Sequence, residues 1–133
     1  MTSKVTYQGA LRTTCVHLAS GNEIITDAPT DNHGKGEAFS PTDTVATALA
    51  SCMLTVMGIK AQGLEVDLEG TYAEVTKHMA SEPRRIAKIV VRIVFAQAVS
   101  AKTQKLLERT ALTCPVHASL HPDMEKDIVF VWP

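Results

Sequence analysis

The sequence predicts a single α+β domain, and three observations support that prediction. Short β-prone runs open the chain, one long apolar helix follows, and two Val- and Ile-rich runs precede the remaining helix signals. Because strands and helices come in groups and do not alternate as β-α-β units, the class is α+β. The 133 residues are 45% apolar, which suffices for one core in a chain of ordinary domain length. We therefore expect residues 1–133 to form one domain.

The N-terminal part of the chain is predicted to be an antiparallel meander. Residues 4–9, 11–18 and 23–28 are short runs of strand-forming residues, and Ser20-Gly21-Asn22 supplies turn residues before the third run. A polar loop follows over residues 29–38 and shows no periodicity.

The strongest local signal is a helix start. Ser40 provides an N-cap hydroxyl, Pro41 occupies the first helical position and Asp43 is an acid at N3. Residues 44–60 are apolar on almost every face, which predicts a helix buried on all sides. One short chain has little material to surround such a helix, so we expect burial against a second copy. The uncharged run over residues 44–59 has 16 residues, fewer than the about 18–20 strongly apolar residues of a membrane span.

A hairpin is predicted next. Gly63 ends the helical run, residues 64–78 alternate between apolar and polar, and residues 86–97 are rich in Ile and Val. Turn residues at 81–84 separate the two runs, which predicts two long antiparallel strands.

The C-terminal part is predicted to hold a helix, a second helix start and a final strand. Ser100 caps an amphipathic run over residues 101–112, and Cys114 stands at an N-cap position directly before Pro115. Residues 127–132 form the last β run. The predicted order is β-β-β-α-β-β-α-(α)-β.

Charge and composition exclude several classes of protein. Thirteen basic and fourteen acidic residues give a net charge of −1, whereas nucleic acids and anionic membranes are bound through a basic face. The N-terminus has no basic patch followed by an apolar segment, so no secretory signal is expected. Three separated cysteines do not form a disulfide framework. We expect a soluble, cytoplasmic protein without a membrane or nucleic-acid partner.

Two cysteines are candidates for chemistry, and each has a structural alternative. Cys52 lies deep in the apolar helix, where a free cysteine is most often a small core residue. Cys114 stands at a helix start, where backbone N–H groups lower a thiol pKa and favour the thiolate. Both the reactive and the structural interpretation remain open for each.

A metal site is the weaker alternative. Cys114, His117 and His121 offer three possible ligands, and Cys52 could be a fourth. Structural zinc sites show tight pairs such as Cys-x2-Cys, which are absent here. We therefore expect no metal and no cofactor.

The arrangement of these motifs resembles one known superfamily along essentially the whole chain. Ser-Pro-Thr-Asp at 40–43 precedes Cys52, Thr-Cys-Pro-Val-His-Ala-Ser-Leu follows at 113–120, and Gly-Ala-Leu-Arg at 9–12 and Asp27 also fit. Together they resemble the OsmC/Ohr superfamily of osmotically inducible protein C and organic hydroperoxide resistance proteins. The details look closest to its shorter OsmC-like branch.

The resemblance implies both a fold and an activity. It implies antiparallel sheets wrapped around central buried helices in an intertwined homodimer, and a thiol-dependent peroxidase that reduces organic hydroperoxides in oxidative-stress defence. Cys52 would attack the peroxide, and Cys114 would convert the sulfenic acid into a disulfide. Arg12 would stabilise the thiolate. A thiol reductant, of which the family implies a dihydrolipoyl protein, would restore both thiols.

The chemistry fits the residues, with one departure. A buried thiol is a poor nucleophile unless a cation favours its thiolate, and Arg12 is such a cation. Leu49, Met53 and Met57 are expected to line an apolar substrate pocket. The hydroperoxide reductases carry Glu directly after the Pro of the helix start, where this chain has Thr. Asp43, one position later, would either replace that Glu or serve only as the capping acid.

Two further interpretations complete the predictions. The same dimer could bind a small apolar ligand at its interface without catalysis, its thiols inactive. Cys15 lies three residues from Arg12 and therefore on the opposite face of one strand. It matches no cysteine of the family, and we interpret it as structural.

Overall fold

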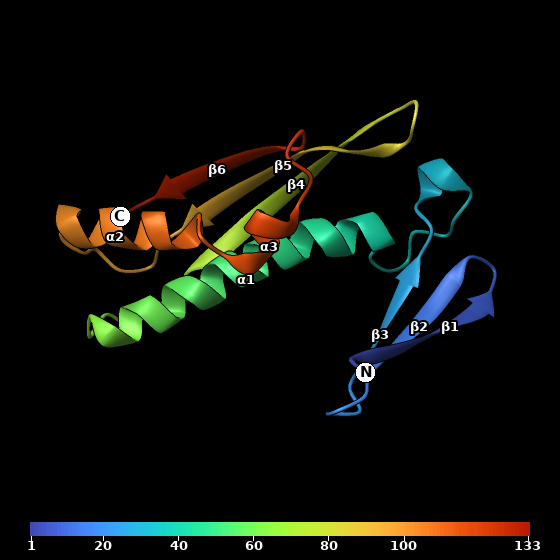
Figure 1. Ribbon diagram of the computed structural model, residues 1–133, viewed down its shortest axis with the longest axis horizontal. Helices are drawn as coiled ribbons and strands as arrows, with labels where there is room; N and C mark the ends of the chain where they lie inside the picture. The colour runs from blue at the N-terminus through green and yellow to red at the C-terminus, as the bar shows by residue number, and fades with distance from the viewer. The chain divides into compact units, whose positions relative to one another are not determined.

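The computed structural model describes residues 1–133 and has a mixed α+β architecture (Figure 1). Its elements in chain order are β1 (Ser3–Gly9), β2 (Arg12–His17), β3 (Glu23–Asp27), the 3₁₀ turn η1 (Thr30–Asn32), α1 (Pro41–Gly63), β4 (Tyr72–Ala80), β5 (Arg85–Val94), α2 (Ala101–Ala111), α3 (Pro115–Ser119) and β6 (Glu125–Val131). The predicted class and the predicted order of elements are confirmed. The chain divides into two compact units, Met1–Val45 and Ala46–Pro133.

The first unit is built on the antiparallel meander β1-β2-β3. Leu11 has a left-handed backbone, with φ of 62°, and for this reason β2 begins one residue later than predicted. The β2–β3 register pairs Arg12 with Asp27 and Cys15 with Ile24, so strand alternation puts Arg12 and Cys15 on opposite faces, as predicted. Only three residues of this unit are buried, and all are polar: Thr26, Asp27 and Ser40.

The start of α1 has the predicted capping box. The backbone N–H of Asp43 donates to Ser40 Oγ at 3.0 Å, and the backbone N–H of Ser40 donates to Asp43 Oδ2 at 2.9 Å. These reciprocal bonds satisfy two N–H groups that the helix itself leaves unpaired.

Helix α1 is longer than its uncharged run. Its 23 residues, with a single acid and a single lysine, make it long and apolar enough to cross a membrane by length and composition. The expectation that this segment is too short to span a membrane was therefore wrong as a statement about length, because a helix can include charged residues in its terminal turns. Six of its 23 residues are buried, and they belong to the core of the second unit. Within one chain the helix is therefore not buried on all sides as the sequence had predicted, because the sheet and the other helices cover only one face of it.

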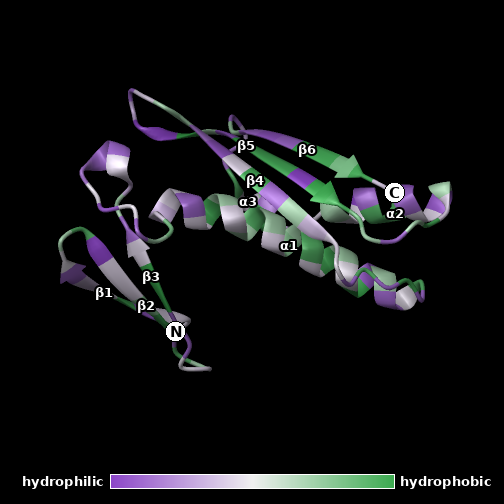
Figure 2. Cartoon of the chain, turned by 180° about the vertical axis from the view of Figure 1, so that it is seen from behind, coloured by the Kyte–Doolittle hydropathy of each residue, from purple (hydrophilic) through white to green (hydrophobic).

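The second unit has its own hydrophobic core. Its sheet has the order β4-β5-β6, with β5 antiparallel to β4 and parallel to β6. This sheet is therefore mixed and not purely antiparallel as expected, because β6 follows β5 through two helices and not through a hairpin turn. The buried apolar core residues come from α1, β5, the turn after β5, α2 and the position before α3: Ala46, Leu49, Ala50, Met53, Met57, Ala61, Ile89, Val91, Ile93, Phe95, Leu107, Ala111 and Cys114. Hydrophobic residues run along α1 in Figure 2.

The predicted strand over residues 64–78 was wrong in its first half. Strand β4 begins only at Tyr72. Residues 64–71 form turns, in which the N–H groups of Leu64 and Val66 both donate to the carbonyl of Ala61. Leu64, Val66 and Leu68 are partly buried against the core. The alternation of apolar and polar residues over this segment therefore arises because every second side chain packs against the core, and not because the segment pairs with a strand.

Candidate functional site

The two candidate thiols lie in the second unit and interact with each other. Cys52 lies on α1, is half-buried and packs against the core; Cys114 precedes α3 and is completely buried. The Cys52 thiol is close enough to be among the groups that raise the pKa of Cys114. Both cysteines are free thiols. The fold thus brings together two cysteines that are 62 positions apart in the sequence.

Burial dominates the acidity of Cys114. Its sulfur accepts the backbone N–H of His117 at 3.3 Å, as the predicted N-cap position requires. Even so, the pKa of Cys114 is raised, and burial of the thiol is the largest cause. The backbone N–H of His117 has the next largest effect and lowers the pKa, whereas the neighbouring Cys52 raises it further. The expected lowering of this pKa was wrong, because a sequence position at a helix start does not reveal burial.

The metal alternative gains no support from the arrangement of side chains. No group of three or more His, Cys, Asp or Glu side chains is placed to hold a metal ion. His117 offers Cys114 its backbone N–H, and burial together with Lys126 lowers the pKa of its imidazole. His121 is exposed and lies 3.9 Å from Asp123.

In the first unit, Arg12 is held by two carboxylates. Its Nε donates to Asp27 Oδ1 at 2.7 Å and its Nη2 to Asp27 Oδ2 at 2.8 Å, a bidentate pair in which Asp27 is buried. Its Nη2 also donates to Glu37 Oε2 at 3.2 Å. The hydrogen bonds from Arg12 lower the pKa of Asp27, and Asp27 in turn raises the pKa of Arg12.

Asp43 has the capping role that the sequence offered as one of its two interpretations. The acids that hold Arg12 are Asp27 and Glu37. Asp27 had been noted only as a residue that fits the family pattern, with no role assigned, and Glu37 was not predicted at all. Glu37 lies in a loop without periodicity, so no pattern singled it out. The available signal was the pair of glycines before it, because such residues permit close backbone approach.

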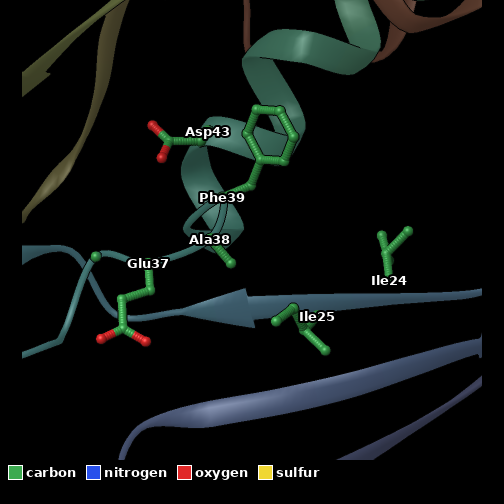
Figure 3. Close-up of a pocket in the computed structure, with 7 residues that line it drawn as sticks. Ile24, Ile25, Glu37, Ala38, Phe39 and Asp43 are labelled. Atoms are coloured by element: carbon green, nitrogen blue, oxygen red, sulfur yellow. The ribbon is translucent and has the colours of Figure 1, made fainter.

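An open pocket of about 630 Å³ lies next to Glu37 in the first unit (Figure 3). It is lined by Ile24, Ile25, Gly36, Glu37, Ala38, Phe39 and Asp43. The apolar side chains of this lining come from β3 and from the segment before α1 (Figure 3).

The residues that the sequence assigned to an apolar pocket lie elsewhere. Leu49, Met53 and Met57 are fully buried in the core of the second unit, so they do not line an open pocket. That expectation was wrong, because a helix hydrophobic on most faces gives no sign of which face meets the sheet.

Cys15 is half-buried beside a second, smaller pocket of about 240 Å³ in the first unit. Thr13 Oγ1 lies 3.8 Å from its sulfur. Its structural interpretation stays a prediction.

Fold and thiols together define an α+β protein with two free thiols, one on the long helix α1 and one directly before the short helix α3. The family model for OsmC-like protein matches residues 34–128, and the chain therefore belongs to the OsmC-like family. The resemblance to the OsmC/Ohr superfamily is confirmed.

Solved structures agree with this assignment. The chain is 61% identical to a Psychrobacter arcticus protein named for osmotic stress induction and a detoxification response, with a TM-score of 0.95, covering 98% of this chain and 95% of that one. An organic hydroperoxide resistance protein OsmC from Legionella pneumophila is 13% identical (TM-score 0.77, coverage 98% and 97%). An OsmC-like protein from Mycoplasma pneumoniae is 15% identical (TM-score 0.78, coverage 98% and 94%). The last two show a common fold alone. A comparison with curated protein sequences found no match.

Proposed function

We propose that the protein is a cysteine-based peroxidase that reduces organic hydroperoxides in oxidative-stress defence. The observation that carries this proposal is the pair of interacting free thiols, one half-buried on α1 and one fully buried before α3. Membership of a family whose relatives include an organic hydroperoxide resistance protein supports the substrate class.

The proposed reaction has two steps in the protein. The Cys52 thiolate attacks the terminal peroxide oxygen, the O–O bond breaks, and the alkoxide leaves and takes up a proton to become an alcohol. Cys52 is oxidised by two electrons to a sulfenic acid. The Cys114 thiol then attacks the Cys52 sulfur, a disulfide forms and water leaves. A dithiol reductant, for which we propose a dihydrolipoyl protein, returns both cysteines to thiols.

The environments of the thiols support this division of roles. Burial and the neighbouring sulfur hold the proton on Cys114, which suits a residue that attacks second. Cys52 is the less buried thiol and hence the one that substrate reaches first. Arg12 is the cation that we assign to the thiolate and to the peroxide oxygens. Asp43 caps the start of α1, the helix that carries Cys52.

We further propose that the protein works as an intertwined homodimer in the cytoplasm. Helix α1 exposes Thr47, Ser51, Thr55 and Ile59 at four-residue spacing, a stripe of uncharged side chains that a second copy could cover. The first unit also exposes most of its large apolar side chains, which is typical of a surface that an interface covers. A reducing compartment suits a cysteine pair that must be re-reduced after each turnover.

The pocket near Glu37 suits an apolar ligand, and it also supports one alternative function. Ile24, Ile25 and Phe39 give this pocket of the first unit an apolar lining. If the thiols are inactive, the same pocket would serve a binding protein for small apolar ligands.

Single-turnover consumption of cumene hydroperoxide by the reduced protein tests the proposal. Cys52→Ser is expected to lose the first turnover, because a serine hydroxyl without an adjacent base does not attack the peroxide. Cys114→Ser is expected to keep it and then to progress to sulfinic acid with excess peroxide. Cys15→Ser is the matched control and should behave as the wild type. Wild-type consumption by both Cys52→Ser and Cys114→Ser would refute catalysis and favour the binding function.

A further inference from the structure

Helix α2 of the second unit carries a row of exposed cations, here called the basic stripe: Lys102, Lys105 and Arg109. The three side chains lie on one face, because steps of three and four residues return to the same side of a helix. None of them forms an ion pair, whereas Arg92 on β5 pairs with Glu74 at 3.0 Å. The basic stripe is therefore a patch of positive charge that the chain itself does not neutralise.

The acid on α2 does not pair with the stripe. Residues 95–122 contain the three cations and a single acid, Glu108, although the whole chain has thirteen basic and fourteen acidic residues. The Glu108 carboxylate accepts the indole N–H of Trp132 at 2.9 Å. Its hydrogen-bond partner is thus the residue that follows β6, and the stripe stays a local basic surface on a chain of nearly balanced charge.

The basic stripe leads to the segment that carries one of the two thiols. Leu112, the C-cap of α2, continues the stripe by three residues and is 46% exposed. Cys114 comes two positions later, directly before α3 (Figure 1), and its backbone N–H donates to the carbonyl of Ala111 at 3.3 Å. From Lys102 to Leu112 the helix rises by about 15 Å. A row of cations that ends in an exposed leucine therefore lies beside Cys114, and protein interfaces combine apolar and charged contacts in this way.

The proposed reaction cycle requires a second protein at this place. To reduce the disulfide, one thiolate of the reductant attacks a sulfur of the pair, the S–S bond breaks and a mixed disulfide forms. The second thiol of the reductant then displaces the protein sulfur, so that two electrons and two protons pass to Cys52 and Cys114. Cys52 is half-buried and Cys114 is completely buried. A dithiol that is attached to a protein must therefore be held close to them while it reacts.

We propose that the basic stripe is the docking surface for an acidic face of the protein that carries the reducing dithiol. This inference rests on the proposed peroxidase function. Opposite charges steer two proteins together and accelerate their encounter without tight binding. A brief encounter suits a reductant that leaves after each turnover, and interfaces of redox partners are correspondingly small.

Re-reduction of the disulfide form by two different dithiols tests the proposal. One is a dihydrolipoyl domain with an acidic surface, and the other is dihydrolipoamide, a small neutral molecule. The variant Lys102→Gln/Lys105→Gln/Arg109→Gln removes the three charges and keeps residues that favour a helix. At low ionic strength its rate with the acidic domain should fall by about tenfold or more. Its rate with dihydrolipoamide should change by less than about twofold, because a neutral molecule is not steered by charge.

Salt provides a second measurement on the same proteins. Added salt screens the attraction between exposed charges. The wild-type rate with the acidic domain should therefore fall as ionic strength rises and approach that of the α2 variant. Single-turnover reduction of cumene hydroperoxide should be the same in both proteins, since the stripe has no part in that step.

The matched control removes the same amount of charge from another surface of the second unit. Arg85→Gln/Lys88→Gln/Arg92→Gln changes three cations of β5. This variant should keep the wild-type rate with both dithiols.

Four results would overturn the inference. Equal slowing of both triple variants would mean that net charge sets the rate, and equal slowing of the α2 variant with both dithiols would mean that the cations act on the cysteines themselves. A wild-type rate of the α2 variant with the acidic domain would refute docking and leave the peroxidase function intact. If that variant instead lost binding to vesicles of anionic phospholipid, the stripe would be a membrane-binding surface. Failure of the wild type to form a disulfide with peroxide would refute the proposed function and this inference together.

Discussion

The two units of the chain are organised by different forces. The second unit, Ala46–Pro133, is organised around thirteen buried apolar residues from its helices and its central strand. The first unit, Met1–Val45, buries only Thr26, Asp27 and Ser40, and it exposes large apolar side chains such as Val5 and Tyr7. Hydrogen bonds and ion pairs around Asp27 take the place of a core there.

This difference places the groups of the proposed reaction in two different environments. The thiols lie in the unit with the apolar core, where burial raises the pKa of Cys114. The cation lies in the unit with the polar centre, where paired carboxylates fix its orientation. A polar centre positions a charged group well but stabilises a fold poorly, so the first unit is the part that should depend on a partner copy.

Core substitutions should show the largest contrast between the units. Met53→Ala removes a fully buried side chain of the second unit and should lower the free energy of unfolding by about 2–5 kcal/mol. Val5→Ala, at a side chain that is 60% exposed, should cost less than about 1 kcal/mol. Chemical denaturation monitored by the single tryptophan, Trp132, measures both. Equal losses would contradict the contrast.

Dimerisation is the next test. The wild type should sediment as a dimer at micromolar concentration, because α1 exposes a stripe of uncharged side chains from Thr47 to Ile59. Thr55→Arg places a charge in that stripe and should weaken the dimer by about a hundredfold or more. Thr76→Arg, on the exposed face of β4, is the control and should remain dimeric. A well-folded wild-type monomer would contradict the proposed assembly.

Removing the cation should slow catalysis while leaving the core intact. Arg12→Ala is expected to reduce the rate of peroxide reduction by about a hundredfold, because it deletes the charge and donors assigned to the reacting groups. The near-ultraviolet circular dichroism of Trp132 should be unchanged, since that side chain stacks on Phe95 within the second unit. Arg92→Ala removes another paired surface arginine and should not slow the reaction.

The pH dependence of stability should differ in sign between the units. The lowered pKa of Asp27 contributes stability that is present above its unfolded value of about 3.9 and is lost as pH falls through the folded pKa. The raised pKa of Cys114 contributes stability that is present below about 8.5 and is lost as pH rises through the folded pKa. The free energy of unfolding should be measured by chemical denaturation between pH 3 and 10. Asp27→Asn should lack the fall in stability at low pH, and Cys114→Ala should lack the fall at high pH. Unchanged pH profiles in these variants would contradict the assignment.

Local sequence determined most of what could be predicted. The capping box of Ser40 and Asp43, the N-cap at Ser100 and the N-cap at Cys114 each involve residues within three positions of each other. The order of strands and helices followed from periodicity and turn residues in the same way. The pairing of Cys52 with Cys114 came instead from the family resemblance.

What sequence reasoning missed depends on contacts between distant residues. Burial of Cys114, the inward face of α1 and the packing of Leu64, Val66 and Leu68 are set by tertiary structure. Glu37 meets Arg12 only because a loop 25 positions away in sequence folds back onto β2 and β3. The two glycines before Glu37 indicate only a tight backbone path, and no local pattern identifies Arg12 as the partner.

Titration of the reduced protein with cumene hydroperoxide, followed by intact mass and peptide mapping, tests the central claim most directly. After about one equivalent of peroxide, each chain should lose two hydrogens and contain one disulfide between Cys52 and Cys114. Addition of a dihydrolipoyl dithiol should restore the starting mass. A stable gain of one or two oxygens on Cys52, or a disulfide that includes Cys15, would contradict the account, because Cys114 would then not be the resolving thiol.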